Sequence, residues 1–137
     1  MPNYPMFQYL DQIAQEIELS LKLHWDVFRH IIEAQNAETL LNPDFLDEDE
    51  CILRLRKFTR LRKTLQVQRK HLGQLQDLYD KLLQEAMFYK HFVLSLRLKK
   101  ETKWNLKDLF SNVKNEETRI YECKASLQVR LKALTCK

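Results

Sequence analysis

The sequence predicts an all-α protein: an elongated antiparallel bundle of three helices, packed as in a coiled coil. From Cys51 to Leu96, steps of three and four residues alternate through fourteen positions, of which twelve are apolar. This spacing places side chains on one stripe of a helix that lies against other helices. The 137 residues include one glycine and three prolines, so few turns are expected. We expect a single helical domain over residues 1–137.

The first helix is predicted at about residues 4–41. Pro5 suits a first-turn position, where no backbone donor is needed. Asn42-Pro43-Asp44 ends the helix, because proline lacks a donor and disfavours a helical residue before it. The apolar stripe of this helix consists of Met6, Leu10, Ile13, Ile17, Leu21, His24, Phe28 and Ile31.

The second helix is predicted at about residues 48–100. Asp47 can accept a hydrogen bond from the backbone of Glu50, and Leu46 and Cys51 can pack as a hydrophobic staple. The lysines near residue 100 suit the negative end of a helix dipole. Two residues in the row from 51 to 96 are polar, Arg54 and Gln68. Each of them either fixes the register of packing or faces water.

The third helix is predicted at about residues 105–135. Asn105 can cap it, with Asp108 three residues later and Trp104 and Leu109 as the staple. Its stripe contains seven apolar residues in nine. The stripe consists of Leu106, Leu109, Val113, Glu116, Ile120, Cys123, Leu127, Arg130 and Leu134.

Gly73 offers an alternative architecture. A glycine that follows basic residues can terminate a helix. A turn there would divide the second helix and give a compact four-helix bundle. The row of apolar residues passes through Gly73 without a shift, however, and one glycine inside a helix costs only about 1 kcal/mol. We therefore expect the helix to continue through it.

Charge is segregated along the chain. Residues 1–50 contain eleven acidic and two basic residues, a net charge of −9, whereas residues 51–137 have a net charge of +13. The basic side chains pair with the acidic first helix, meet an acidic partner protein, or attract a nucleic acid or an anionic membrane. The segment 54–70 has no acid and eight basic residues: Arg54, Arg56, Lys57, Arg60, Arg62, Lys63, Arg69 and Lys70.

The sequence contains no pattern typical of a catalytic, metal-binding or cofactor-binding site. The histidines lack the i, i+4 spacing of a helical zinc site, and His24 is expected to be a core or seam residue. With a single glycine there is no phosphate-cradling loop. We therefore expect a protein that is not an enzyme and that uses no metal, cofactor or small-molecule substrate.

Aromatic residues gather near the predicted end of the second helix and the start of the third. They either seal one end of the bundle or anchor a partner, since aromatic side chains dominate interface hot spots. The residues expected to contact partners are Phe58, Leu61, Leu65, Leu72, Leu75, Tyr79, Leu82, Phe88, Tyr89, Phe92, Val93, Leu96, Trp104 and Phe110.

These patterns predict a non-catalytic structural or scaffold subunit that packs with other helical chains in a hetero-oligomer. Kinetochore, centrosome and other cell-division complexes, tethers and transcription coregulators contain small helical subunits of this kind. Three widely spaced cysteines and the absence of a visible leader or membrane span favour an intracellular location, cytoplasmic or nuclear. One alternative is a secreted cytokine-like four-helix ligand with a Cys51–Cys123 disulfide. Another is a nucleic-acid-binding bundle that uses residues 54–70.

Overall fold

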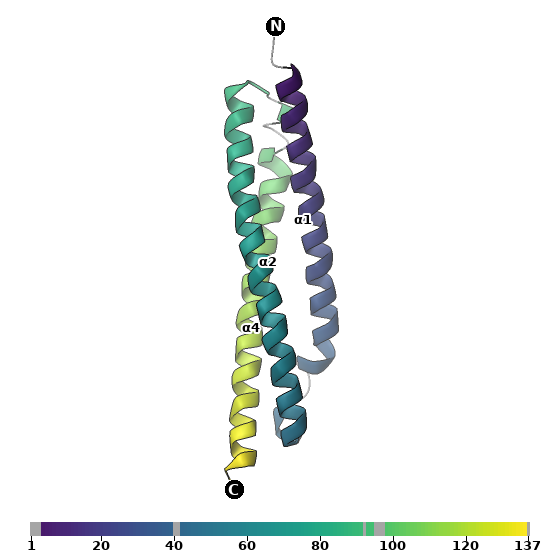
Figure 1. The fold of residues 1–137 in the computed structure, drawn as a ribbon, viewed down its shortest axis with the longest axis vertical. Helices are drawn as coiled ribbons and strands as arrows, with labels where there is room; N and C mark the ends of the chain where they lie inside the picture. The colour runs from purple at the N-terminus through teal and green to yellow at the C-terminus, as the bar shows by residue number, and fades with distance from the viewer. Residues whose placement is uncertain (1–3, 40–41, 92, 95–97, 137) are drawn as a thin grey trace. The chain divides into compact units, whose positions relative to one another are not determined.

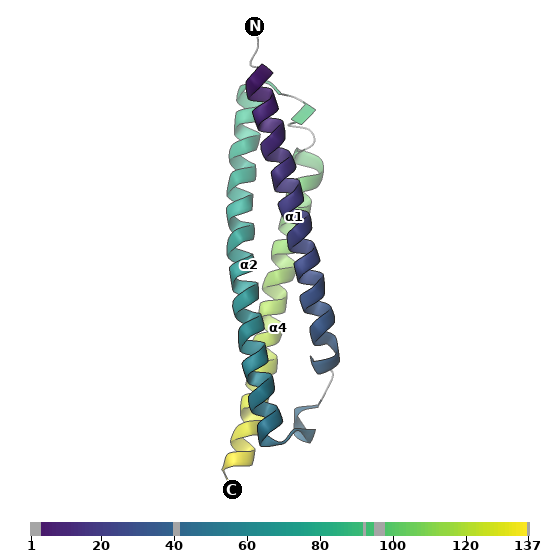
Figure 2. The same cartoon turned by 45° about the vertical axis from the view of Figure 1, so that its right-hand side comes forward.

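The computed structural model describes residues 4–39, 42–91, 93–94 and 98–136. These residues contain three long helices, α1 (Tyr4–Thr39), α2 (Glu48–Phe88) and α4 (Lys103–Thr135), and no strand (Figure 1). A 3₁₀ turn, η1 (Pro43–Phe45), lies between α1 and α2, and a π-helical turn, η2 (Leu98–Thr102), directly precedes α4 (Figure 2). The predicted all-α class with three long helices is therefore confirmed for the described residues.

The start of α2 is capped as the sequence predicts. The Asp47 carboxylate accepts a hydrogen bond from the backbone N–H of Glu50 at 2.8 Å. Leu46 and Cys51, the predicted staple, are both buried. The carbonyl of Leu46 accepts a hydrogen bond of 3.2 Å from Arg130 Nε of α4. A local cap and a tertiary contact therefore both hold the N-terminus of α2 in place.

The helix α2 passes through Gly73 without a turn. The turn required by the compact four-helix alternative therefore does not form. A Cβ atom added at Gly73 would meet no atom within 4 Å, so open space lies beside this residue. The glycine neither ends the helix nor fits it against a neighbouring backbone.

The predicted end of the second helix, near residue 100, is wrong, because α2 ends at Phe88. The backbone N–H of Lys90 donates to the carbonyl of Met87 at 3.1 Å, and that of His91 donates to Ala86 at 2.7 Å. This pair of bonds is a Schellman motif, in which the residue after the helix adopts the left-handed conformation. That residue is Lys90, with a φ of 59°.

Contacts from α1 explain why a lysine adopts a conformation that favours glycine. The His91 ring lies 4.6 Å from the Phe7 ring, and its Nε2 lies 3.0 Å from Asp11 Oδ1. The left-handed conformation costs a non-glycine residue about 1–2 kcal/mol. The contacts of His91 with α1 can offset that cost and hold the turn after Phe88.

The third long helix begins earlier than predicted, at Lys103 rather than Asn105. Asn105 therefore lies inside α4 and does not cap it. The turn η2 is anchored to α2, because the buried hydroxyl of Tyr79 donates a hydrogen bond to the carbonyl of Leu98. The predicted end at Thr135 is confirmed. The first helix ends at Thr39, and the last two residues of its predicted range lie outside the described residues.

The chain divides into two compact units. The first unit comprises Met1–Asp26 and Arg69–Ser111, and the second comprises Val27–Gln68 and Asn112–Lys137. Most buried residues of the first unit are apolar: Leu10, Ala14, Ile17, Leu21, Leu72, Tyr79, Leu82, Ala86, Leu94, Leu98, Leu106 and Leu109. Among its described residues, the second unit buries apolar side chains together with four polar ones, Gln35, Gln68, Glu116 and Glu117.

Candidate interaction surfaces

The predicted contact residues of α2 lie mostly inside this chain's own core. Five of them are at most 3% exposed, namely Phe58, Leu65, Leu72, Tyr79 and Leu82. Leu61 and Leu75 of α2 are half-buried, as are two predicted contact residues outside this helix, Tyr89 and Phe110. A partner cannot reach the five buried side chains while the chain stays folded. Phe92 and Leu96 lie outside the described residues.

Three of the predicted contact residues are strongly exposed. The exposed fraction is 79% for Phe88, 77% for Val93 and 69% for Trp104. All three belong to the first unit. These side chains do not seal a bundle end, because they lie mostly in solvent. Phe45 and Val129 of the second unit are exposed to a similar degree, at 84% and 71%, so exposure by itself does not distinguish the two units. A contiguous apolar patch is what marks an interaction site.

An aromatic surface in the first unit includes the exposed Phe88. It surrounds a hollow of about 450 Å³ and consists of Met6, Tyr9, Gln84, Glu85, Phe88 and Tyr89. The Phe88 and Tyr89 rings pack edge to face, with centroids 5.1 Å apart. The Schellman motif sets their positions, since both residues lie at the end of α2. The sequence indicated aromatic residues here, but the contribution of Met6 and Tyr9 depends on the packing of α1.

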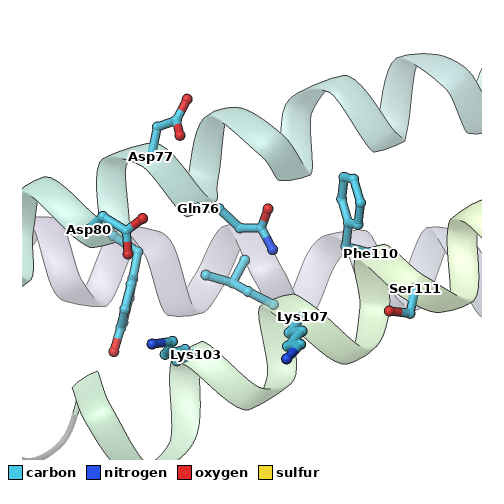
Figure 3. Close-up of a pocket in the computed structure, with 9 residues that line it drawn as sticks. Gln76, Asp77, Asp80, Lys103, Lys107, Phe110 and Ser111 are labelled. Atoms are coloured by element: carbon cyan, nitrogen blue, oxygen red, sulfur yellow. The ribbon is translucent and has the colours of Figure 1, made fainter.

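A second hollow, the α2–α4 groove, has a volume of about 420 Å³ (Figure 3). Figure 3 shows Gln76 of α2 and Phe110 of α4 pointing into the space between these helices. Leu106 and Tyr79 contribute buried atoms to the groove. Its complete lining is Gln76, Asp77, Tyr79, Asp80, Lys103, Leu106, Lys107, Phe110 and Ser111. Apart from Tyr79 and Phe110, none of these was among the predicted site residues.

Burial raises the pKa of the Tyr79 phenol, and the nearby Asp80 carboxylate raises it further. The phenol therefore stays protonated and remains the donor to Leu98. Tyr79 is consequently a structural residue, although the sequence grouped it with the partner contacts.

The basic segment 54–70 has both solvent-facing and packed members. Five of its side chains are exposed, namely Arg56, Lys57, Arg60, Lys63 and Lys70, and three are half-buried, namely Arg54, Arg62 and Arg69. The Arg62 guanidinium lies over the Tyr121 ring of α4, 5.1 Å from its centroid. This contact is a cation–π interaction. The pairing of the segment with the acidic first helix remains a prediction.

Glu116 interrupts the apolar stripe of α4 and is buried in the second unit. Arg119, one turn later, donates from Nη2 to Glu116 Oε1 at 2.6 Å and from Nε to both carboxylate oxygens at 3.1 Å. The hydrogen bonds to Glu116 raise the pKa of Arg119. Gln68 of α2 is buried in the same unit. This polar member of the apolar row in α2 therefore does not face water.

His24 occupies the seam position expected for it and is half-buried. Its ring centroid lies 6.1 Å from that of His71. Burial lowers the pKa of His24, and the neighbouring His71 lowers it further. Within the described residues, no three His, Cys, Asp or Glu side chains are grouped so that they could hold a metal ion.

All three cysteines are free thiols in the structure, and burial raises the pKa of Cys51 and of Cys123. No helix in the described part of the chain combines the length and the apolar character needed to cross a bilayer.

No protein-family model matches the chain, and comparisons with curated proteins and with solved structures gave no match.

Proposed function

We propose that this protein is a non-catalytic structural subunit that binds other helical chains through its first unit. The observation that carries this proposal is the aromatic surface around the hollow of the first unit, which includes Tyr9, Tyr89 and the strongly exposed Phe88. The core of the first unit is already filled by Leu72, Tyr79 and Leu82. A contiguous aromatic patch outside a filled core is typical of an interface.

The burial pattern of α2 supports packing of the coiled-coil type. Buried positions recur every seven residues, at Cys51, Phe58, Leu65, Leu72, Tyr79 and Ala86, and Gln68 and Leu82 are buried between them. A seven-residue repeat keeps one stripe of a long helix against its neighbours. We infer that partner helices extend the same kind of packing. The partners fit a hetero-oligomeric intracellular assembly of the kinetochore, centrosome, tether or coregulator type.

A nucleic-acid-binding bundle is the second candidate. The exposure of Arg56, Lys57, Arg60, Lys63 and Lys70 favours it. Binding to a DNA duplex that weakens steeply with salt, and that falls after replacement of Arg60 and Lys63, would support this candidate over the scaffold. The secreted four-helix ligand lacks comparable support, because the turn at Gly73 on which it depends does not form.

The test of the scaffold function compares two double variants in a tagged pull-down from the native source. Phe88→Ala/Trp104→Ala removes exposed aromatics of the first unit, and Phe45→Ala/Val129→Ala removes exposed apolar residues of the second. Truncation of two interface anchors typically weakens binding by tenfold or more. We expect the first variant to lose the co-purifying helical subunits and the second to retain them. Equal retention by both variants would contradict the proposal.

A further inference from the structure

The α2–α4 groove has opposite charges on its two sides. Asp77 and Asp80 lie on α2, whereas Lys103 and Lys107 lie on α4, and all four side chains are exposed. Within the described part of the chain, no ion pair joins the acidic side to the basic side. The groove therefore presents an acidic edge and a basic edge to whatever enters it.

The interior of the groove suits a side-chain seam rather than a small polar ligand. Phe110 is half-buried and points into the groove (Figure 3). The buried Leu106 also lines the groove. The Tyr79 hydroxyl is already bound to Leu98, so it is not a free donor for a ligand. The polar groups that remain are the charged edges, with Gln76 and Ser111.

Gly73 continues this face of α2. It lies one helical turn before Gln76, so both residues share a face of the helix. No atom lies within 4 Å of a Cβ built at Gly73, so this face of the helix is open beside the glycine. A glycine beside open space permits the close approach of another backbone.

From this arrangement we infer that the α2–α4 groove receives one helix of a partner protein, whose apolar seam is flanked by acids on one side and by bases on the other. The acids of the partner face Lys103 and Lys107, and its bases face Asp77 and Asp80. Pairs of this kind select partner and orientation more than they add affinity. This inference rests on the proposed scaffold function and specifies the chemistry of the partner.

Three fluorescently labelled helical peptides, each about four heptads long with the same leucine seam, provide the probes. One carries glutamate on one flank and lysine on the other, one carries lysine on both flanks, and one carries glutamate on both. Binding to the full chain is measured by fluorescence anisotropy at about 0.15 M salt. Nanomolar peptide concentrations limit pairing between the peptides themselves.

The wild-type chain should bind the mixed peptide about threefold to tenfold more tightly than the other two. Lys103→Glu/Lys107→Glu makes both edges acidic and should shift the preference to the lysine peptide. Asp77→Lys/Asp80→Lys makes both edges basic and should shift it to the glutamate peptide. The control Lys63→Glu/Lys132→Glu changes the net charge by the same amount as the groove lysine variant, at exposed lysines outside the groove, and it should keep the wild-type order. Circular dichroism checks that each variant remains helical.

The inference is overturned if no peptide binds, if the wild type binds the glutamate or the lysine peptide as tightly as the mixed one, or if the control shifts the order as much as the groove variants. It is also overturned if sedimentation shows that the chain self-associates and that the groove variants abolish this association, because a second copy would then be the occupant. The pull-down with Phe88→Ala/Trp104→Ala does not involve these charges. Failure of the peptide test with loss of partners in that pull-down would leave the scaffold function standing.

Discussion

The two compact units differ in what they bury. The second unit encloses Glu116, Glu117, Gln35 and Gln68, whereas the buried residues that the structure describes in the first unit are apolar apart from Thr102. The hollows described above, the aromatic surface and the α2–α4 groove, both belong to the first unit. Polar core residues favour one arrangement of helices at some cost in stability. We infer that the second unit fixes the register of this chain, while the first unit binds partners.

The largest expected difference in the free energy of unfolding is between substitutions at two positions on the same stripe of α2. Leu72 belongs to the first unit and Gln68 to the second, and both are buried. Leu72→Gln should reduce the free energy of unfolding by about 4 kcal/mol, because it removes apolar contacts and buries an amide. Gln68→Leu should change it by less than about 1 kcal/mol, since a polar group leaves the core. Urea unfolding gives both values, and equal losses would remove the distinction between the cores.

A smaller effect is expected where the first unit anchors η2. Tyr79→Phe removes the hydroxyl that bonds to Leu98 and leaves a buried carbonyl without that donor. The expected loss is about 1–2 kcal/mol in the free energy of unfolding. Hydrogen exchange should rise in residues 98–102 more than in the second unit. Uniform exchange across both units would show that this bond does not hold η2 locally.

Lys90→Gly should stabilise the protein by about 1 kcal/mol, because glycine adopts the left-handed conformation at φ 59° without steric cost. The matched control is Lys81→Gly, at an exposed position inside α2. It should destabilise the protein by about 1 kcal/mol. Thermal unfolding of the two variants gives shifts of opposite sign if Lys90 ends the helix as described.

The smallest effect is a pH dependence in the first unit. The pKa of His24 is lower in the folded state than its ordinary value of 6.5, so the unfolded chain binds the proton more tightly. The stability from neutral His24 is therefore present above pH 6.5 and is lost as the pH falls through the lowered folded pKa. His24→Gln should flatten this decline in urea midpoints measured below pH 6.5. An unchanged decline would assign the dependence to other groups.

Capping and periodicity predicted much of the fold from the sequence. The Asp47 cap, the continuation of α2 through Gly73 and the end of α4 at Thr135 were all expected, because each depends on residues close in sequence. The end of α2 was not expected, because Lys90 lacks the sequence signal of a C-terminal cap. The contacts of His91 with Phe7 and Asp11 join residues about eighty positions apart.

The candidate surfaces were predicted less completely than the fold. Aromatic composition indicated Phe88 and Trp104, but periodicity also placed buried side chains such as Leu65 in the expected interface. A heptad stripe shows that a residue is covered, and it does not distinguish coverage by the same chain from coverage by a partner. The α2–α4 groove depends on which residues of two helices lie side by side, so Asp80 and Lys103 gave no local signal.

The most direct test is hydroxyl-radical footprinting of the full chain, alone and in its native assembly. Tyr9, Phe88 and Trp104 report on the first unit, and Phe45 and Tyr121 report on the second, since all five are exposed in the isolated chain. We predict that oxidation of the first three falls several-fold in the assembly while that of Phe45 and Tyr121 stays within about twofold. Protection of Phe45 and Tyr121 with no change at Phe88 and Trp104 would contradict the assignment of partner binding to the first unit.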